Sequence, residues 1–82
     1  MNGFIVVAID KNNQKSYIMN TSPILWTSKI KDAKIFEAYK FAKNELEDHF
    51  TLLCATLSYT DICSIWILEY TNDKEIGREK FL

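Results

Sequence analysis

The stretch FIVVAI, from Phe4 to Ile9, decides the fold, because it is apolar throughout and rich in β-branched residues. Its length and composition predict a buried strand over residues 3–10. The polar run Lys11-Asn12-Asn13-Gln14 follows, and Asn tolerates the positive φ of a tight turn. We therefore expect residues 15–20 to return antiparallel as the second strand of a hairpin.

A second apolar run, SIWILEY from Ser64 to Tyr70, predicts another strand over residues 63–70. Before it, TLLCATLSY alternates between larger apolar and smaller or polar side chains, which predicts a strand over residues 51–59. Thr60 and Asp61 provide the turn between them. Two further strands are thus expected in the second half of the chain.

Between the two pairs of strands the spacing favours one amphipathic helix over residues 32–49, with Asp32 as a cap and an apolar stripe along one side. Before the helix, Pro23 ends the second strand, and the apolar segment 24–26 is either an extended strand or a plug over one end of the core. The residues expected to pack in the core are Trp26, Ile35, Phe36, Tyr39 and Leu46.

The order strand, strand, helix, strand, strand predicts an α+β fold: one domain over residues 1–82, with a two-layer ββαββ arrangement. Its sheet would have four antiparallel strands and carry the helix on one face. The tail 71–82 is mostly charged, and we expect it either to form a short or frayed helix or to dock back through Phe81 and Leu82.

Composition excludes several classes of protein. Ten basic and eleven acidic residues give 82 residues a net charge of −1, unlike a polybasic protein that binds nucleic acids or membranes by bulk charge. No apolar segment has the length of a membrane span, and the N-terminal apolar run lacks a preceding basic region. We expect a cytoplasmic protein with Cys54 and Cys63 reduced and at least half-buried.

The chain offers little chemistry. His49 lies one helical turn after Glu45, but with Cys54 and Cys63 it matches no zinc-binding spacing. The only glycines are Gly3 and Gly77, so no glycine-rich phosphate loop exists. We expect no catalytic residue, no metal ligand and no cofactor, and hence a protein that is not an enzyme.

The two most apolar predicted strands carry hydrophobic side chains on both faces, whereas one helix covers only one face. Either Trp26 and the Phe81-Leu82 tail cover the second face, or it meets a second copy or another protein. We favour the intermolecular contact, which predicts a protein-interaction module that forms a homodimer through the sheet or its edge. The predicted interaction residues are Trp66, Leu68, Tyr70 and Phe41, the last lying off the helical stripe.

An alternative function uses charge. Lys29, Lys31 and Lys34 cluster before and at the start of the predicted helix and would form a basic edge for nucleic acid. Arg is the residue that favours base and phosphate recognition, and the only Arg, Arg78, lies in the tail. The nucleic-acid function therefore ranks below protein interaction.

The pair Trp26-Thr27, followed by Asp32-Ala33-Lys34-Ile35-Phe36, resembles a Trp-Thr…Ala-x-x-Phe segment of small phage and prophage accessory proteins. The resemblance covers residues 17–42. It implies a packing role for Trp26 and Phe36 and carries no catalytic residue with it. It also implies a setting in which small proteins bind and inhibit a host defence protein.

Overall fold

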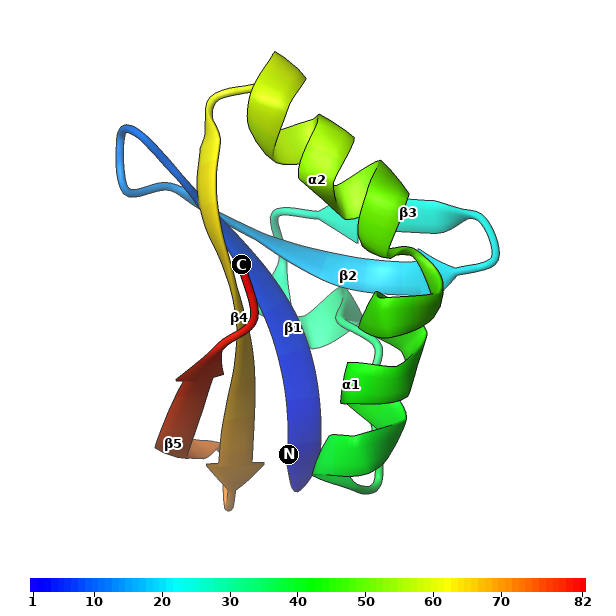
Figure 1. The fold of residues 1–82 in the computed structure, drawn as a ribbon. Helices are drawn as coiled ribbons and strands as arrows, with labels where there is room; N and C mark the ends of the chain where they lie inside the picture. The colour runs from blue at the N-terminus through cyan, green and yellow to red at the C-terminus, as the bar shows by residue number, and fades with distance from the viewer.

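The computed structural model describes residues 1–82 and confirms the α+β class, with one strand and one helix more than expected. Figure 1 shows a five-stranded sheet with two consecutive helices in front of it. All pairings are antiparallel, and the strand order is β3-β2-β1-β4-β5. The elements are β1 (Gly3–Asp10), β2 (Lys15–Thr21), β3 (Ile24–Thr27), the 3-10 helix η1 (Ile30–Asp32), α1 (Tyr39–Asp48), α2 (Phe50–Tyr59), β4 (Ile62–Thr71) and β5 (Lys74–Lys80).

The central strand is β1, which contains the apolar run from Phe4 to Ile9. It pairs with β4 from Gly3 opposite Tyr70 to Asp10 opposite Ile62, and with β2 only through residues 7–9. Residues 5–8 are all fully or almost fully buried, at 0–1% exposure. A strand buried on both faces needs no polar alternation, which explains the continuous apolar sequence.

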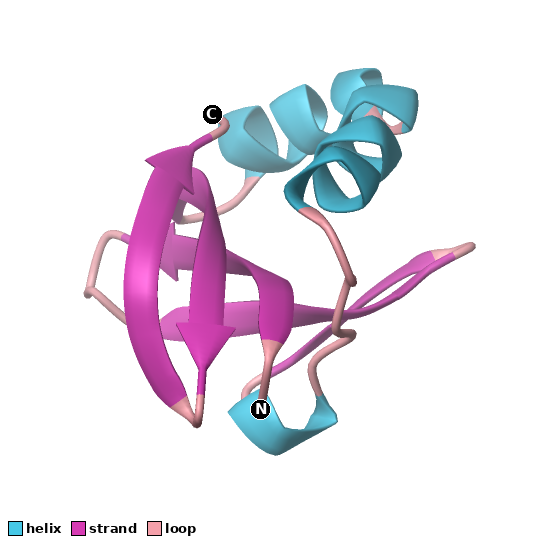
Figure 2. Cartoon of the chain, turned by 90° about the horizontal axis from the view of Figure 1, so that it is seen from below, coloured by secondary structure: helices cyan, strands magenta, loops and turns pink.

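Both faces of the sheet are covered, although unequally. Figure 2 shows α1 and α2 on one side of the sheet and η1 on the other. The buried cluster on the helix side consists of Val6, Ala8, Ile18, Phe36, Ala42, Leu46, Leu53, Ile65 and Ile67. The smaller buried cluster on the η1 side consists of Ile5, Val7, Tyr17 and Leu68.

The strand predicted over residues 51–59 is wrong, because this segment forms α2. Its leucines and Ala55 are good helix formers, and Leu53 and Leu57 meet the core one helical turn apart. The hydroxyls of Thr56 and Ser58 donate to the carbonyl oxygens four residues earlier, at 2.9 and 3.1 Å. These bonds satisfy the polar side chains inside the helix, so the apparent alternation has no structural meaning.

The single helix predicted over residues 32–49 is also wrong in its first part. The chain forms η1 and then runs extended until α1 begins at Tyr39. Lys34 donates its backbone N–H to the carbonyl of Ile18 (2.8 Å), and Phe36 forms a two-way bridge with Phe4. These residues therefore join the sheet ladder instead of a helix, in the gap where β2 has left β1.

The tail is neither a helix nor frayed. Residues 74–80 form the edge strand β5, which follows a tight turn where Asn72 and Asp73 both have positive φ. Phe81 and Leu82 pack against the helix-side cluster and not over the opposite face of the sheet. Neither α1 nor α2 is long and apolar enough to cross a membrane.

Candidate functional site

The sheet face opposite the helices holds three of the four predicted interaction residues. Trp66, Leu68 and Tyr70 all belong to the η1-side cluster, as their alternation along β4 requires. Leu68, however, is only 2% exposed, because Ile30 and Ala33 pack over this part of the sheet. The prediction that Leu68 lies on an interaction surface is therefore wrong.

Trp66 and Tyr70 remain half-buried on the same face. The guanidinium carbon of Arg78 and the ammonium of Lys80 lie 5.8 and 6.0 Å from the centre of the Trp66 ring. Burial raises the pKa of Tyr70, and the charge of Glu75 acts in the same direction. This face is thus smaller and more charged than the open apolar patch that the sequence predicts.

The predicted basic edge is divided between two environments. Lys29 and Lys31 are exposed at η1. The ammonium of Lys34 lies 3.4 Å from the Thr21 hydroxyl and 5.3 Å from the centre of the Phe36 ring. Two free lysines and one engaged lysine make a weaker phosphate-binding edge than three free ones.

His49 lies at the junction of α1 and α2. Its Nδ1 is 2.9 Å from the carbonyl oxygen of Glu45, which places the ring at the end of α1. The thiols of Cys54 and Cys63 are both free, and Cys63 is exposed, contrary to expectation. Cys63 is the second residue of β4 and lies at the bulge between Ile62 and Ser64, where it has no partner in β1, and this position explains its exposure.

Four of the five predicted core residues lie in or against the helix-side cluster. Phe36 and Leu46 are buried, and Trp26 and Tyr39 pack against them. Ile35 is 47% exposed, so its assignment to the core is wrong. The error has the same cause as the misplaced helix, because an extended backbone at residues 33–38 turns alternate side chains to opposite sides.

The surface that sequence reasoning missed lies on α2. Leu52 is 53% exposed, Tyr59 is 88% exposed, and Ala55 lies between them at helical spacing. Phe50, at the start of the helix, is 49% exposed while its ring contacts Phe81 edge-on at 6.3 Å. We refer to Phe50, Leu52, Ala55 and Tyr59 as the α2 surface.

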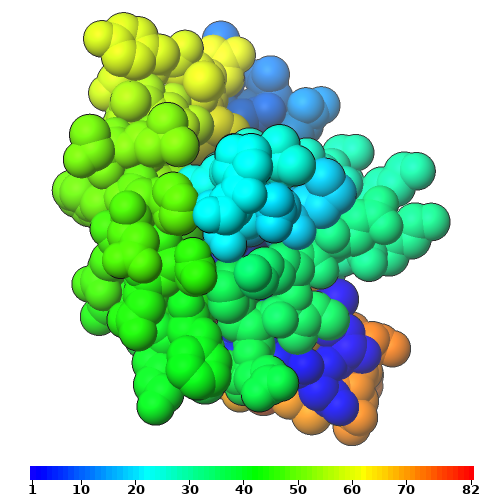
Figure 3. All heavy atoms as spheres, turned by 90° about the vertical axis from the view of Figure 1, so that its right-hand side faces the viewer, coloured from blue at the N-terminus to red at the C-terminus, as the bar shows by residue number.

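A shallow groove of about 520 Å³ runs along the beginning of the α2 surface. Phe50, Leu52 and Ala55 line its apolar part, and Glu47 and Asp48 of α1 contribute the acidic rim. Figure 3 shows α1 and α2 as one continuous flank of the molecule, beside the turn that joins β2 and β3. Phe41, the remaining predicted interaction residue, is 47% exposed on α1.

One signal for this surface was present in the sequence: residues 50–59 contain no charged side chain. The absence of charge is not unusual for a strand, which is the structure that the sequence predicts for these residues. A helix on the outside of a small domain normally has a charged outer side, which α2 lacks, although its exposed Thr51 and Ser58 are polar. Comparison with protein-family models, curated proteins and solved structures finds no match for this chain.

Proposed function

We propose that the protein is a protein-interaction module that binds its partner through the α2 surface. The observation that carries the proposal is a solvent-facing helix without a single charged residue. Its two outermost apolar side chains, Leu52 and Tyr59, are more than half exposed. Contiguous apolar area of this kind on a small protein usually marks a contact surface.

The spacing of the exposed side chains fits recognition by a helix. Leu52, Ala55 and Tyr59 lie at positions i, i+3 and i+7, the pattern by which one helix face fills an apolar groove. Tyr59 also has a polar hydroxyl on a large apolar ring, a combination that is enriched in protein interfaces.

Charge narrows the class of partner. Glu47 and Asp48 are exposed beside the groove and make no ion pair within the chain. A partner with an apolar contact surface bordered by Lys or Arg would be steered toward this flank and held in register. The resemblance to small phage proteins supports a host protein as that partner.

A second copy of the chain is the other occupant to consider, because the sequence pattern predicts a homodimer. Light scattering at micromolar concentration measures this directly. A mass twice 9.6 kDa that returns to 9.6 kDa in the variant Leu52→Glu/Tyr59→Glu would identify the partner as a second copy. An unchanged doubled mass in that variant would instead place the dimer contact on the sheet.

The partner test uses the same double variant in affinity capture from host extract, with the bound proteins compared by mass spectrometry. The control is Ile76→Glu, which changes a side chain with a similar exposure of 58% on β5. Proteins retained by the wild type and by Ile76→Glu, but lost by the double variant, support the proposal. A protein lost equally from both variants, or from neither, contradicts it.

A further inference from the structure

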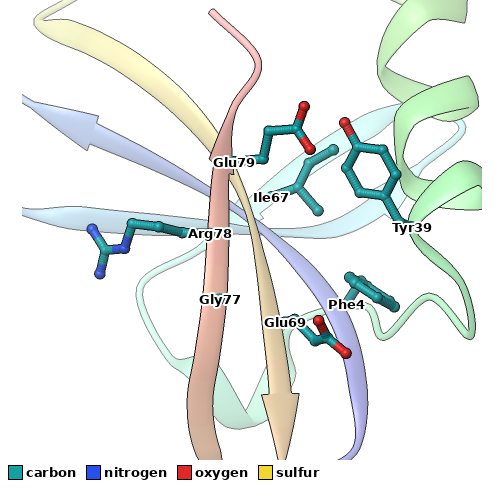
Figure 4. A pocket seen from close by; sticks show the side chains of 7 residues that line it. All are labelled: Phe4, Tyr39, Ile67, Glu69, Gly77, Arg78 and Glu79. Atoms are coloured by element: carbon teal, nitrogen blue, oxygen red, sulfur yellow. The ribbon is translucent and has the colours of Figure 1, made fainter.

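A separate pocket lies on the helix side of the sheet, between the first turn of α1 and the strands β4 and β5. Its volume is about 280 Å³. Figure 4 shows Phe4, Ile67 and Tyr39 around its apolar part, with the carboxylates of Glu69 and Glu79 on the strand side. The Phe4 and Tyr39 rings meet edge-on, with their centres 6.2 Å apart.

Gly77 is the reason that the pocket is open. It lies on β5 directly opposite Glu69 of β4 and two residues before Glu79. A Cβ added there would meet only Oε1 of Glu69, at 3.9 Å, and the backbone of Gly77 does not require a glycine. A glycine within a strand marks a bulge or a close approach. Gly77 adjoins the bulge between Glu69 and Tyr70, and its missing side chain leaves the space beside Glu69 open.

The electrostatics of the pocket are negative. Burial raises the pKa of Tyr39, and the nearby carboxylates of Glu79 and Glu47 raise it further. Arg78 also borders the pocket, but Figure 4 shows its guanidinium pointing away from it. That guanidinium is held by both carboxylate oxygens of Glu75, at 2.7 and 3.0 Å.

We propose that this pocket binds an organic cation with a short aliphatic stem, an alkylammonium or alkylguanidinium group. The stem would lie on Phe4 and Ile67, and the cationic head would lie at the end of the pocket where the Glu79 carboxylate points toward Tyr39. Ion pairing and the attraction of a cation to an aromatic face act together on such a head group.

One cation of the chain already uses the same chemistry. The ammonium of Lys43 lies 5.9 Å from the centre of the Tyr39 ring. This position shows that the Tyr39 ring attracts a cation. Lys43 does not line the pocket, so its ammonium leaves the pocket free for a ligand. The proposal does not depend on the α2 surface, and either can fail without the other.

The test is an NMR titration of the full chain with n-butylamine, below its pKa, and with neutral n-butanol. For a ligand of this size we expect a dissociation constant on the order of millimolar. The shifts should concentrate on the amides of Tyr39, Ile67 and Gly77. Glu79→Gln should weaken binding by roughly tenfold, the loss of one charged hydrogen bond. Glu69→Gln, at the other end of the pocket, should weaken it less.

The matched control is Asp61→Asn, which makes the same change of charge at an exposed site paired only with Lys11. It should bind butylamine as the wild type does. A plug variant, Gly77→Leu, should abolish binding, and its fold is checked by the retained dispersion of its other amide signals. Equal shifts with n-butanol, or wild-type binding by Glu79→Gln, would overturn the proposal.

Two further titrations distinguish whether the cation is a free amine or a lysine side chain of a partner protein. Free small amines and the lysine side chain of a partner share the proposed chemistry, so the titration is repeated with Nα-acetyl-lysine amide and with a short lysine-containing peptide. A peptide that binds at least tenfold more tightly than butylamine identifies a protein ligand. Tighter binding of butylamine identifies a free amine.

Discussion

Phe4 and Phe36 exchange two backbone hydrogen bonds, although 32 positions separate them in the chain. The N–H of Phe4 donates to the carbonyl oxygen of Phe36 at 2.9 Å, and the N–H of Phe36 donates back at 2.8 Å. This bridge carries the chain from the η1 side of the sheet to the helix side. It therefore fixes where α1 begins and which side chains the first turn of α1 presents.

The first prediction concerns Gly3, which lies beside this bridge with a φ of +135°. A Cβ there would lie 2.8 Å from the Phe36 carbonyl oxygen and 2.6 Å from a methyl of Ile35. Gly3→Ala should therefore lower the free energy of unfolding by roughly 2 kcal/mol or more, from strain and the displaced bridge. Urea unfolding measures the loss, and Gly77→Ala, whose Cβ fits, should change the stability by less than about 1 kcal/mol.

The second prediction tests the orientation of α2. Leu53 is fully buried, whereas its neighbour Leu52 is 53% exposed. Leu53→Ala should lower the free energy of unfolding by about 2–5 kcal/mol, and Leu52→Ala should change it by roughly 0.5 kcal/mol or less. Thermal unfolding of the two variants under one buffer condition decides this, and comparable losses would mean that the helix is rotated.

The third prediction concerns the sheet face. Leu68 is 2% exposed, and a carboxylate at that position would be buried without a partner. Leu68→Glu should therefore unfold the protein, seen as loss of near-ultraviolet circular dichroism, and not merely alter its assembly. If the Leu68→Glu variant folds and has a lower mass in solution than the wild type, the prediction is wrong, and the η1 side of the sheet is an interface.

The fourth prediction follows from Tyr39 and Tyr70, whose pKa values are both raised above the ordinary value of 10.0. The folded chain holds these protons more tightly than the unfolded chain does. Their contribution to stability is therefore complete below about pH 10 and falls as the pH rises through the folded-state values. Denaturant midpoints at increasing alkaline pH should show a decline that Tyr39→Phe makes shallower, whereas Tyr59→Phe, at an exposed position, should leave the slope unchanged.

The sequence predicted some elements well for a clear reason. Residues 4–9 and 65–68 are apolar without interruption, and a strand covered on both sides buries such a run. The hairpin turn was readable because Asn13 takes a positive φ that few residues accept. The α+β class followed from these two elements and the helical stripe around Leu46.

The errors lie where periodicity was weak or where distant contacts decide. Residues 51–59 carry similar apolar content on every side, so neither a two-residue nor a 3.6-residue period stands out. Residues 33–38 have helical spacing, but the bridge to Phe4 holds them extended. The α2 surface could not be predicted because residues 51–59 were expected to form a strand. The pocket at Gly77 could not be predicted because it depends on β5, and the many charged residues of the tail gave no sign of a strand there.

The position of β1 at the middle of the sheet also constrains how the protein is made. Its main partner, β4, begins more than fifty residues later in the chain. During synthesis the apolar strand β1 therefore stays without its main partner until β4 has left the ribosome. Such long-range pairing slows folding and exposes a strand that is prone to aggregate. Expression should accordingly benefit from chaperones that hold the first ten residues until β4 arrives.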